Sequence, residues 1–270
     1  MVVQALFLFT LAAAAAQPPE TVRVRVFAKH EVRQVFVAGR RFSAAEGRIV
    51  RLSFPSTFTV SVPGLPIRIY AGALEMFARD GKFVLVVEAP LEAYTAGVTE
   101  AEAGADAPAE ALKAQAVAAR SWAAATPARH DGAFCDLSHC QVFPGLAGPA
   151  GRAAAEATRG QVLSRGGRPV PGFYHAVCGG LLDAAGTIWP GTEPRGPARA
   201  DAGADGRTLC ALSPQSRWRA AVPAARLERL ARASGWLGPH EPLDTLAVAE
   251  RSAVRRALTL EVNHTPVNHE

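Results

Sequence analysis

The residues best suited to catalysis lie within residues 91–143, where an acid and two cations accompany a predicted helix. Glu102 stands just before that helix, which carries Lys113 and Arg120. A carboxylate in this place is commonly a cap or dipole partner worth under about 1 kcal/mol, and Glu100 is equally placed for that role. Lys113 and Arg120 are one heptad apart, so they lie within about 20° of each other around the helix. Two cations on one side of an Ala-rich helix suggest an anionic ligand or a paired carboxylate, with a solvated face as the alternative.

A His/Cys cluster follows the helix and consists of His130, Cys135, His139 and Cys140. Thiolates and imidazoles at this density fit a tetrahedral zinc site of structural type. The spacing matches no standard zinc finger, and the adjacent His139 and Cys140 can both ligate only if the backbone turns between them. A small disulfide loop between Cys135 and Cys140 is the alternative.

A third candidate is the stretch YHAVCGG, residues 174–180. Its double glycine lets the backbone approach a ligand closely, or forms a tight turn. A thiol nucleophile at Cys178 with His175 as its base is conceivable. A disulfide from Cys178 to Cys210 is the better use of that thiol, and it would stabilise the fold by about 3–4 kcal/mol. The residues expected to contact a ligand here are Tyr174, His175, Gly179 and Gly180.

Composition and charge narrow the class of partner. The 270 residues fit one large domain or two small ones. The net charge is +5, which can favour nucleic acid, a membrane surface or an acidic polysaccharide. The arginines are scattered and no nucleic-acid-binding module is visible, so we expect no nucleic-acid partner.

The N-terminus has the pattern of a secretory signal peptide over residues 1–16. An apolar stretch leads into a run of alanines followed by Gln17 and two prolines. The stretch is too short to span a membrane, and no other segment is long and apolar enough. We therefore expect cleavage near Ala16 and export to the periplasm or to the cell wall and extracellular space. That compartment permits disulfides.

The elements that must position these residues predict an α+β fold. Residues 17–89 alternate apolar and polar residues in short antiparallel strands, with a hairpin turn at Asp80-Gly81. Residues 90–262 form a mixed helix and strand region that carries the catalytic residues, and 263–270 form a short tail.

Within the mixed region, helices are predicted at 91–98, 109–125, 152–159 and 224–234. Asp106 or Ala107 is the expected N-cap of the long helix, and Pro127 ends it. A hairpin is predicted around Gly166-Gly167, and LTLEV near the end is a strand.

Several segments in order resemble the SpoIID domain, the family of the sporulation stage II protein D and the amidase enhancer LytB. They are LEAYTAGVTEAEAG, EALKAQAVAARSWA, CDLSHCQVF, ATRGQVL and FYHAVCGG, and the resemblance spans roughly residues 22–260. The sporulation members are lytic transglycosylases that act on peptidoglycan strands without stem peptides. The family's GVxxxE acid matches Glu102, and its zinc ligands match His130, Cys135, His139 and Cys140.

The resemblance implies that Glu102 acts first as acid and then as base on MurNAc-GlcNAc strands, with Lys113 and Arg120 binding the lactyl carboxylate. The alternative is a non-catalytic cell-wall module that enhances an N-acetylmuramoyl-L-alanine amidase. A zinc hydrolase is a third possibility, which a site closed by four protein ligands disfavours.

Overall fold

The computed structural model describes residues 18–44, 49–188 and 199–267, so the expected signal peptide lies outside the described residues. The chain divides into two compact units, Met1–Phe173 and Tyr174–Glu270, called here the first and second units. The division falls inside residues 90–262, which were predicted as one region. Among the described residues, no helix combines the length and apolar character that a membrane crossing needs.

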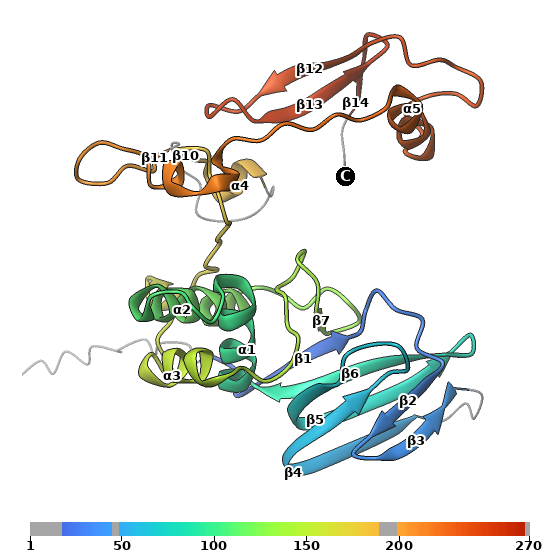
Figure 1. Ribbon diagram of the computed structural model, residues 1–270, viewed down its shortest axis with the longest axis vertical. Helices are drawn as coiled ribbons and strands as arrows, with labels where there is room; N and C mark the ends of the chain where they lie inside the picture. Colours follow the sequence, from blue (N-terminus) through green and yellow to red (C-terminus); the bar gives the residue numbers. More distant parts are fainter. Residues whose placement is uncertain (1–17, 45–48, 189–198, 268–270) are drawn as a thin grey trace, which may run out of the picture. The chain divides into compact units, whose positions relative to one another are not determined.

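The first unit is built on a seven-stranded sheet with the order β3-β2-β4-β5-β6-β1-β7 (Figure 1). All its pairings are antiparallel except β1 with β7. The strands are β1 Thr21–Val26, β2 Gln34–Val37, β3 Arg40–Ser43, β4 Val50–Ser61, β5 Arg68–Arg79, β6 Lys82–Pro90 and β7 Phe134–Cys135. The predicted β-rich region and the α+β class are confirmed.

The predicted hairpin at Asp80-Gly81 joins β5 and β6. Arg79 pairs with Lys82 across a two-residue turn, and both turn residues have positive φ, 54° and 69°. This is the geometry that an Asp-Gly pair favours, because glycine takes a positive φ without steric cost.

Three helices form a helical layer beside one end of the sheet, near β6 and β1, and pack on one another (Figure 1). They are α1 Leu91–Ala103, α2 Ala109–Ala125 and α3 Pro149–Ala157. The bounds predicted for α2 are confirmed, but its N-cap is Pro108, in place of Asp106 or Ala107. Helix α1 continues five residues beyond the predicted end, because TEAEA contains only helix-compatible residues and Gly104 is the first breaker. Helix α3 starts three residues early, at a proline suited to a first turn.

The core is formed mainly by buried residues of the sheet, joined by residues of α1 and α2. In β1 the valines at 22, 24 and 26 are buried while Arg23 and Arg25 face outward. Three buried aromatic rings link the layers, since Phe143 lies 5.7 Å from Tyr70 of β5 and 5.0 Å from Tyr94 of α1, between ring centroids. The first unit ends with the predicted hairpin around Gly166-Gly167, formed by β8 Ser164–Arg165 and β9 Arg168–Pro169.

The second unit consists of short elements followed by a three-stranded sheet of order β12-β13-β14. The predicted helix and strand near the end are confirmed as α5 and β13, and the expected tail contributes β14. The elements are β10 Leu181–Leu182, α4 Ala185–Ile188, β11 Arg199–Ala200, η2 Leu209–Leu212, η3 Pro214–Ser216, α5 Ala224–Ala233, β12 Leu246–Arg251, β13 Ala257–Val262 and β14 Thr265–Val267.

Candidate functional site

The structure brings the four residues of the His/Cys cluster together. Their ligand atoms all lie within 4.8 Å of one another. His130 Nε2 is 2.8 Å from His139 Nε2, Cys135 Sγ is 3.4 Å from His139 Nε2, and Cys140 Sγ is 3.8 Å from His130 Nε2. Both cysteines are free thiols, so the alternative disulfide loop is not formed.

Two tight turns and a strand pairing create the cluster. His130 and Ala133 pair across a turn made by Asp131 and Gly132, both with positive φ. Cys135 follows in β7, held beside Arg25 of β1. The Cys140 N–H donates to the Leu137 carbonyl at 3.0 Å, which supplies the turn that adjacent His139 and Cys140 require to ligate together.

The donor set fits a tetrahedral divalent cation. Bond lengths of about 2.0–2.1 Å to nitrogen and 2.3 Å to sulfur place neighbouring donors roughly 3.3–3.8 Å apart, and the three distances agree to about half an ångström. Burial raises the pKa of the Cys135 thiol to about 11. A coordinated cation would reverse that effect, because a coordinating thiol is deprotonated. The cluster is therefore competent to bind a metal.

Asp136 fixes the cluster loop to the sheet. Its buried carboxylate accepts hydrogen bonds from the backbone N–H groups of Phe27 at 2.8 Å and Ala28 at 3.1 Å. Arg68 of β5 donates to the same carboxylate at 2.6 Å and stacks over the Phe27 ring. Sequence reasoning missed Asp136, although an acid between two candidate ligands was a visible signal.

The residues after Cys140 join the cluster to the helices. The buried Gln141 accepts a hydrogen bond from the Tyr94 hydroxyl of α1 at 2.9 Å. The Val142 N–H donates to Glu102 Oε1 at 2.8 Å, and Phe143 is fully buried between Tyr70 and Tyr94. The segment 140–143 thus ties the cluster to Glu102.

Glu102 lies in the last turn of α1, not at the start of the following helix as predicted. A carboxylate gains nothing from the dipole at that end of a helix, so stabilising α1 does not explain its presence. The side chain is exposed, and within the described residues it accepts a hydrogen bond from the Val142 N–H.

Glu100, two residues before Glu102 in α1, has a structural role. Its two carboxylate oxygens accept the backbone N–H groups of Gly148 at 2.8 Å and Gly151 at 2.9 Å, at the start of α3. Glu100 is therefore the acid that caps a helix, which separates it from Glu102.

Gly97, in the GVxxxE pattern, permits α1 to approach the segment after the cluster. A Cβ atom there would lie 2.2 Å from the Gly145 carbonyl oxygen and 2.8 Å from the Phe143 ring. Only glycine allows this approach. The GVxxxE motif therefore contains both a glycine that close packing requires and, five residues later, the acid Glu102.

Arg120 does not present its guanidinium to a ligand, contrary to expectation. Its side chain is 0% exposed and pairs with Glu92 of α1 through two bonds of 2.9 and 2.6 Å. Its remaining donors reach the carbonyls of Ala155 at 3.0 Å and Gln161 at 3.1 Å. Arg120 is thus a clamp between α1, α2 and the end of α3.

Lys113 keeps the exposed position that a solvated face predicts. Its side chain is 39% exposed and pairs with Glu110, one turn earlier, at 2.7 Å. The shared angular position of Lys113 and Arg120 is real, but their neighbours differ, so the pair forms no common anion site.

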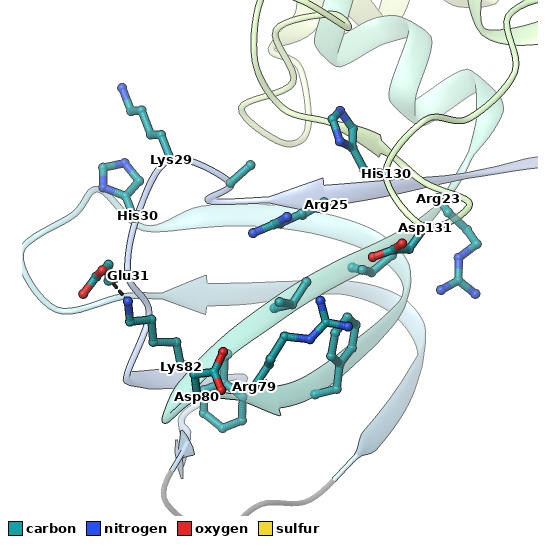
Figure 2. Close-up of a pocket in the computed structure, with 15 residues that line it drawn as sticks. Arg23, Arg25, Lys29, His30, Glu31, Arg79, Asp80, Lys82, His130 and Asp131 are labelled. Atoms are coloured by element: carbon teal, nitrogen blue, oxygen red, sulfur yellow. Dashed lines mark hydrogen bonds and ion pairs between the residues drawn. The ribbon is translucent and has the colours of Figure 1, made fainter. Parts of the chain in front are cut away.

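A basic pocket that sequence reasoning missed lies on the outward face of the sheet beside the cluster (Figure 2). The sequence contained a signal for this pocket, because Arg23 and Arg25 alternate with the buried valines of β1 and therefore share its outward face. Figure 2 shows Arg25 and Arg79 on that face, with His130 and Asp131 of the cluster loop at its border. The charged residues that line it are five cations, Arg23, Arg25, Lys29, Arg79 and Lys82, and three acids, Glu31, Asp80 and Asp131.

The pocket carries free positive charge. Lys82 pairs with Glu31, and Arg23 pairs with Glu75 at 2.9 Å. Within the described residues no ion pair forms at Arg25, Lys29 or Arg79. The pocket can therefore hold an anionic group against the sheet.

The four ligand residues expected in YHAVCGG, Tyr174, His175, Gly179 and Gly180, all belong to the second unit. Gly179 and Gly180 have positive φ, 73° and 94°. A Cβ at Gly180 would lie 2.8 Å from Thr208, so this glycine serves a close approach of the chain to itself. Their contact with a ligand stays a prediction.

The expected partners Cys178 and Cys210 lie together as free thiols, with their sulfurs 3.0 Å apart. The pairing of these two cysteines in space agrees with the prediction. The disulfide bond itself is not formed in this structure.

The first unit is thus an α+β domain whose metal-competent loop is fastened beside an exposed carboxylate. The family model described as Stage II sporulation protein, SpoIID, matches residues 79–164, so this segment of the chain is similar to that family. The match runs from the end of β5 to β8 and includes α1, α2, α3 and the whole cluster. It is narrower than the resemblance over 22–260. The search of curated proteins finds no match.

Proposed function

We propose that this protein is an exported lytic transglycosylase that cleaves MurNAc-GlcNAc strands, with Glu102 as its single acid and base. The observation that carries the proposal is the contrast among the acids of α1. Glu92 and Glu100 are occupied by structural bonds, whereas Glu102 is exposed and is oriented by the Val142 N–H.

One carboxyl group suffices for this reaction. Protonated Glu102 gives its proton to the glycosidic oxygen, and the bond from that oxygen to C1 of muramic acid breaks. The resulting carboxylate takes the proton from the C6 hydroxyl, whose oxygen bonds to C1 and closes the 1,6-anhydro ring. Hydrolytic glycosidases need a second carboxylate at a defined distance. Because Glu102 is exposed, the desolvation that favours the acid form would come from the bound glycan.

The His/Cys cluster would help to hold Glu102 in position. We propose that His130, Cys135, His139 and Cys140 hold one zinc ion, which with four protein ligands supplies a cross-link and no open position. The segment 140–143 connects the cross-linked loop to Glu102, because the Val142 N–H donates a hydrogen bond to the Glu102 carboxylate.

An anionic glycan also suits the basic pocket. Denuded strands carry a lactyl carboxylate on each muramic acid, and within the part of the chain that the structure describes Arg25, Lys29 and Arg79 form no ion pair beside the cluster loop. We propose this pocket, in place of Arg120, as the region that attracts the strand. Lys113 stays a candidate for the same role.

The test is digestion of peptide-denuded glycan strands by the wild type and by Glu102→Gln. The amide keeps the shape but cannot transfer a proton, so strand cleavage should fall by about 10²–10⁴-fold while strand binding persists. Glu110→Gln is the matched control, because Glu110 is an exposed acid on the next helix. Full cleavage by Glu102→Gln would refute this role. Strand binding without cleavage by the wild type would favour the alternative, a wall module that enhances an amidase.

A further inference from the structure

A second group of metal-competent side chains lies in the second unit, outside the segment that matches the SpoIID family. It consists of Cys178, Asp201 and Cys210, whose ligand atoms lie within 4.8 Å of one another. The Cys178 Sγ is 3.0 Å from the Cys210 Sγ and 3.0 Å from Asp201 Oδ2.

The backbone of this unit is organised to bring the three residues together. The pairing of β10 with β11 places Asp201 beside the double glycine, and the Asp201 N–H donates to the Gly180 carbonyl at 3.0 Å. The Leu209 N–H donates to the Asp201 carbonyl at 3.2 Å, which sets Cys210 next to that acid. Asp201 was absent from the sequence-based interpretation, because it lies 23 residues from Cys178.

Backbone N–H groups point at both sulfurs. The Gly180 N–H donates to Cys178 Sγ at 3.2 Å, and the Cys178 N–H donates to Cys210 Sγ at 3.1 Å. The bond from Gly180 has a counterpart in the first cluster, where the N–H of Leu137, also two residues after the cysteine, donates to Cys135 Sγ at 3.4 Å. In both clusters the backbone thus directs N–H groups at the sulfurs of the candidate ligands.

The charge of the group also suits a divalent cation. Two thiolates and one carboxylate carry a formal charge of −3, which a divalent cation reduces to −1. The Arg256 guanidinium is fixed on the same loop by bonds to the carbonyls of Cys178 at 3.1 Å and Leu181 at 3.2 Å, and its charge offsets the remainder.

We propose that Cys178, Asp201 and Cys210 form a second site for a thiolate-preferring divalent cation of the zinc class. Three protein ligands leave the fourth position of a tetrahedral site for water or for the ring of His175 on the same loop. The site pins the Gly-rich loop to the hairpin that contains Asp201. It stands independently of the proposed glycan cleavage, since it uses none of the same residues.

The experiment is metal analysis of the full chain, purified without air, loaded with Zn²⁺ and dialysed. The variants are Cys178→Ser/Cys210→Ser, Asp201→Asn and, as a matched control, Asp205→Asn, whose carboxylate accepts the Arg207 N–H of the same hairpin. The double serine variant should hold one zinc ion fewer per chain than the wild type. Asp201→Asn should lose the same ion on dialysis, and Asp205→Asn should keep it.

A second readout needs no substitution and does not depend on the folding of variants. Zinc should protect Cys178 and Cys210 from alkylation in the wild type, as read by peptide mapping. Three results would overturn the site: equal zinc in the wild type and the double serine variant, thiols that react fully in the presence of zinc, or a Cys178–Cys210 disulfide in protein prepared without air. The last would restore the cross-link expected from the sequence.

Discussion

Arg120 and Lys113 illustrate what can be learned about single residues before a structure is known. Their heptad spacing places them on the same side of α2, and the structure agrees with that angle. Burial depends on neighbours, however, and α1 and the end of α3 enclose Arg120 while leaving Lys113 in solvent. A helix pattern specifies direction around an axis but not which element will lie there, so the ligand role assigned to Arg120 was wrong.

Substitutions at Arg120 and at Lys113 should change the free energy of unfolding by different amounts. Arg120→Met should lower the free energy of unfolding by about 3 kcal/mol, because it leaves Glu92 and the buried Ala155 carbonyl without the Arg120 donor. Lys113→Met should change it by less than about 0.5 kcal/mol, since an exposed ion pair contributes little. Denaturant unfolding measures both, and equal effects would contradict the clamp.

Glu100 and Glu102 could not be separated by spacing alone. Both precede the long helix, and only the packing of α3 against α1 reveals that Glu100 caps α3. The family resemblance selected Glu102, and the geometry gives that selection an independent physical reason.

At the level of elements, much of the chain followed from local patterns. The Asp80-Gly81 hairpin, the bounds of α2 and the two terminal elements follow from turn chemistry, helix propensity and alternation. The ends of α1 and α3 did not, because cap signals shift by several residues when tertiary contacts satisfy the backbone. The basic pocket was missed because it forms across β1, β5, β6 and two loops, which only the sheet order brings together.

The segment 130–143 should behave as one element held by metal. Removing the ion with a chelator should raise hydrogen exchange at the amides of residues 135–143, including that of Val142, and should reduce strand cleavage because Glu102 loses its orienting bond. Adding zinc back should restore both. Amides of the β5–β6 hairpin serve as the internal control. Unchanged exchange and full activity after complete metal removal would show that the cluster does not position the site.

At the level of the whole molecule, the division after Phe173 was not visible in the sequence, which has no linker of distinctive composition there. The complete helical layer, the sheet, the cluster and Glu102 all belong to the first unit. Because that unit has its own core, we expect a fragment of residues 18–173 to fold cooperatively and to bind one zinc ion. Circular dichroism during thermal unfolding, together with metal analysis, would check this. A fragment that stays unfolded in the presence of zinc would show that the units depend on each other.

The central claim concerns the chemistry of the product, and mass spectrometry of a digest of peptide-denuded glycan strands tests it most directly. A single acid and base that closes a ring should leave 1,6-anhydro-muramic acid ends, each lighter by one water than a reducing end. We predict anhydro ends with the wild type and none with Glu102→Gln. Reducing ends from the wild type would show hydrolysis and contradict the account, as would anhydro ends formed at full rate by Glu102→Gln.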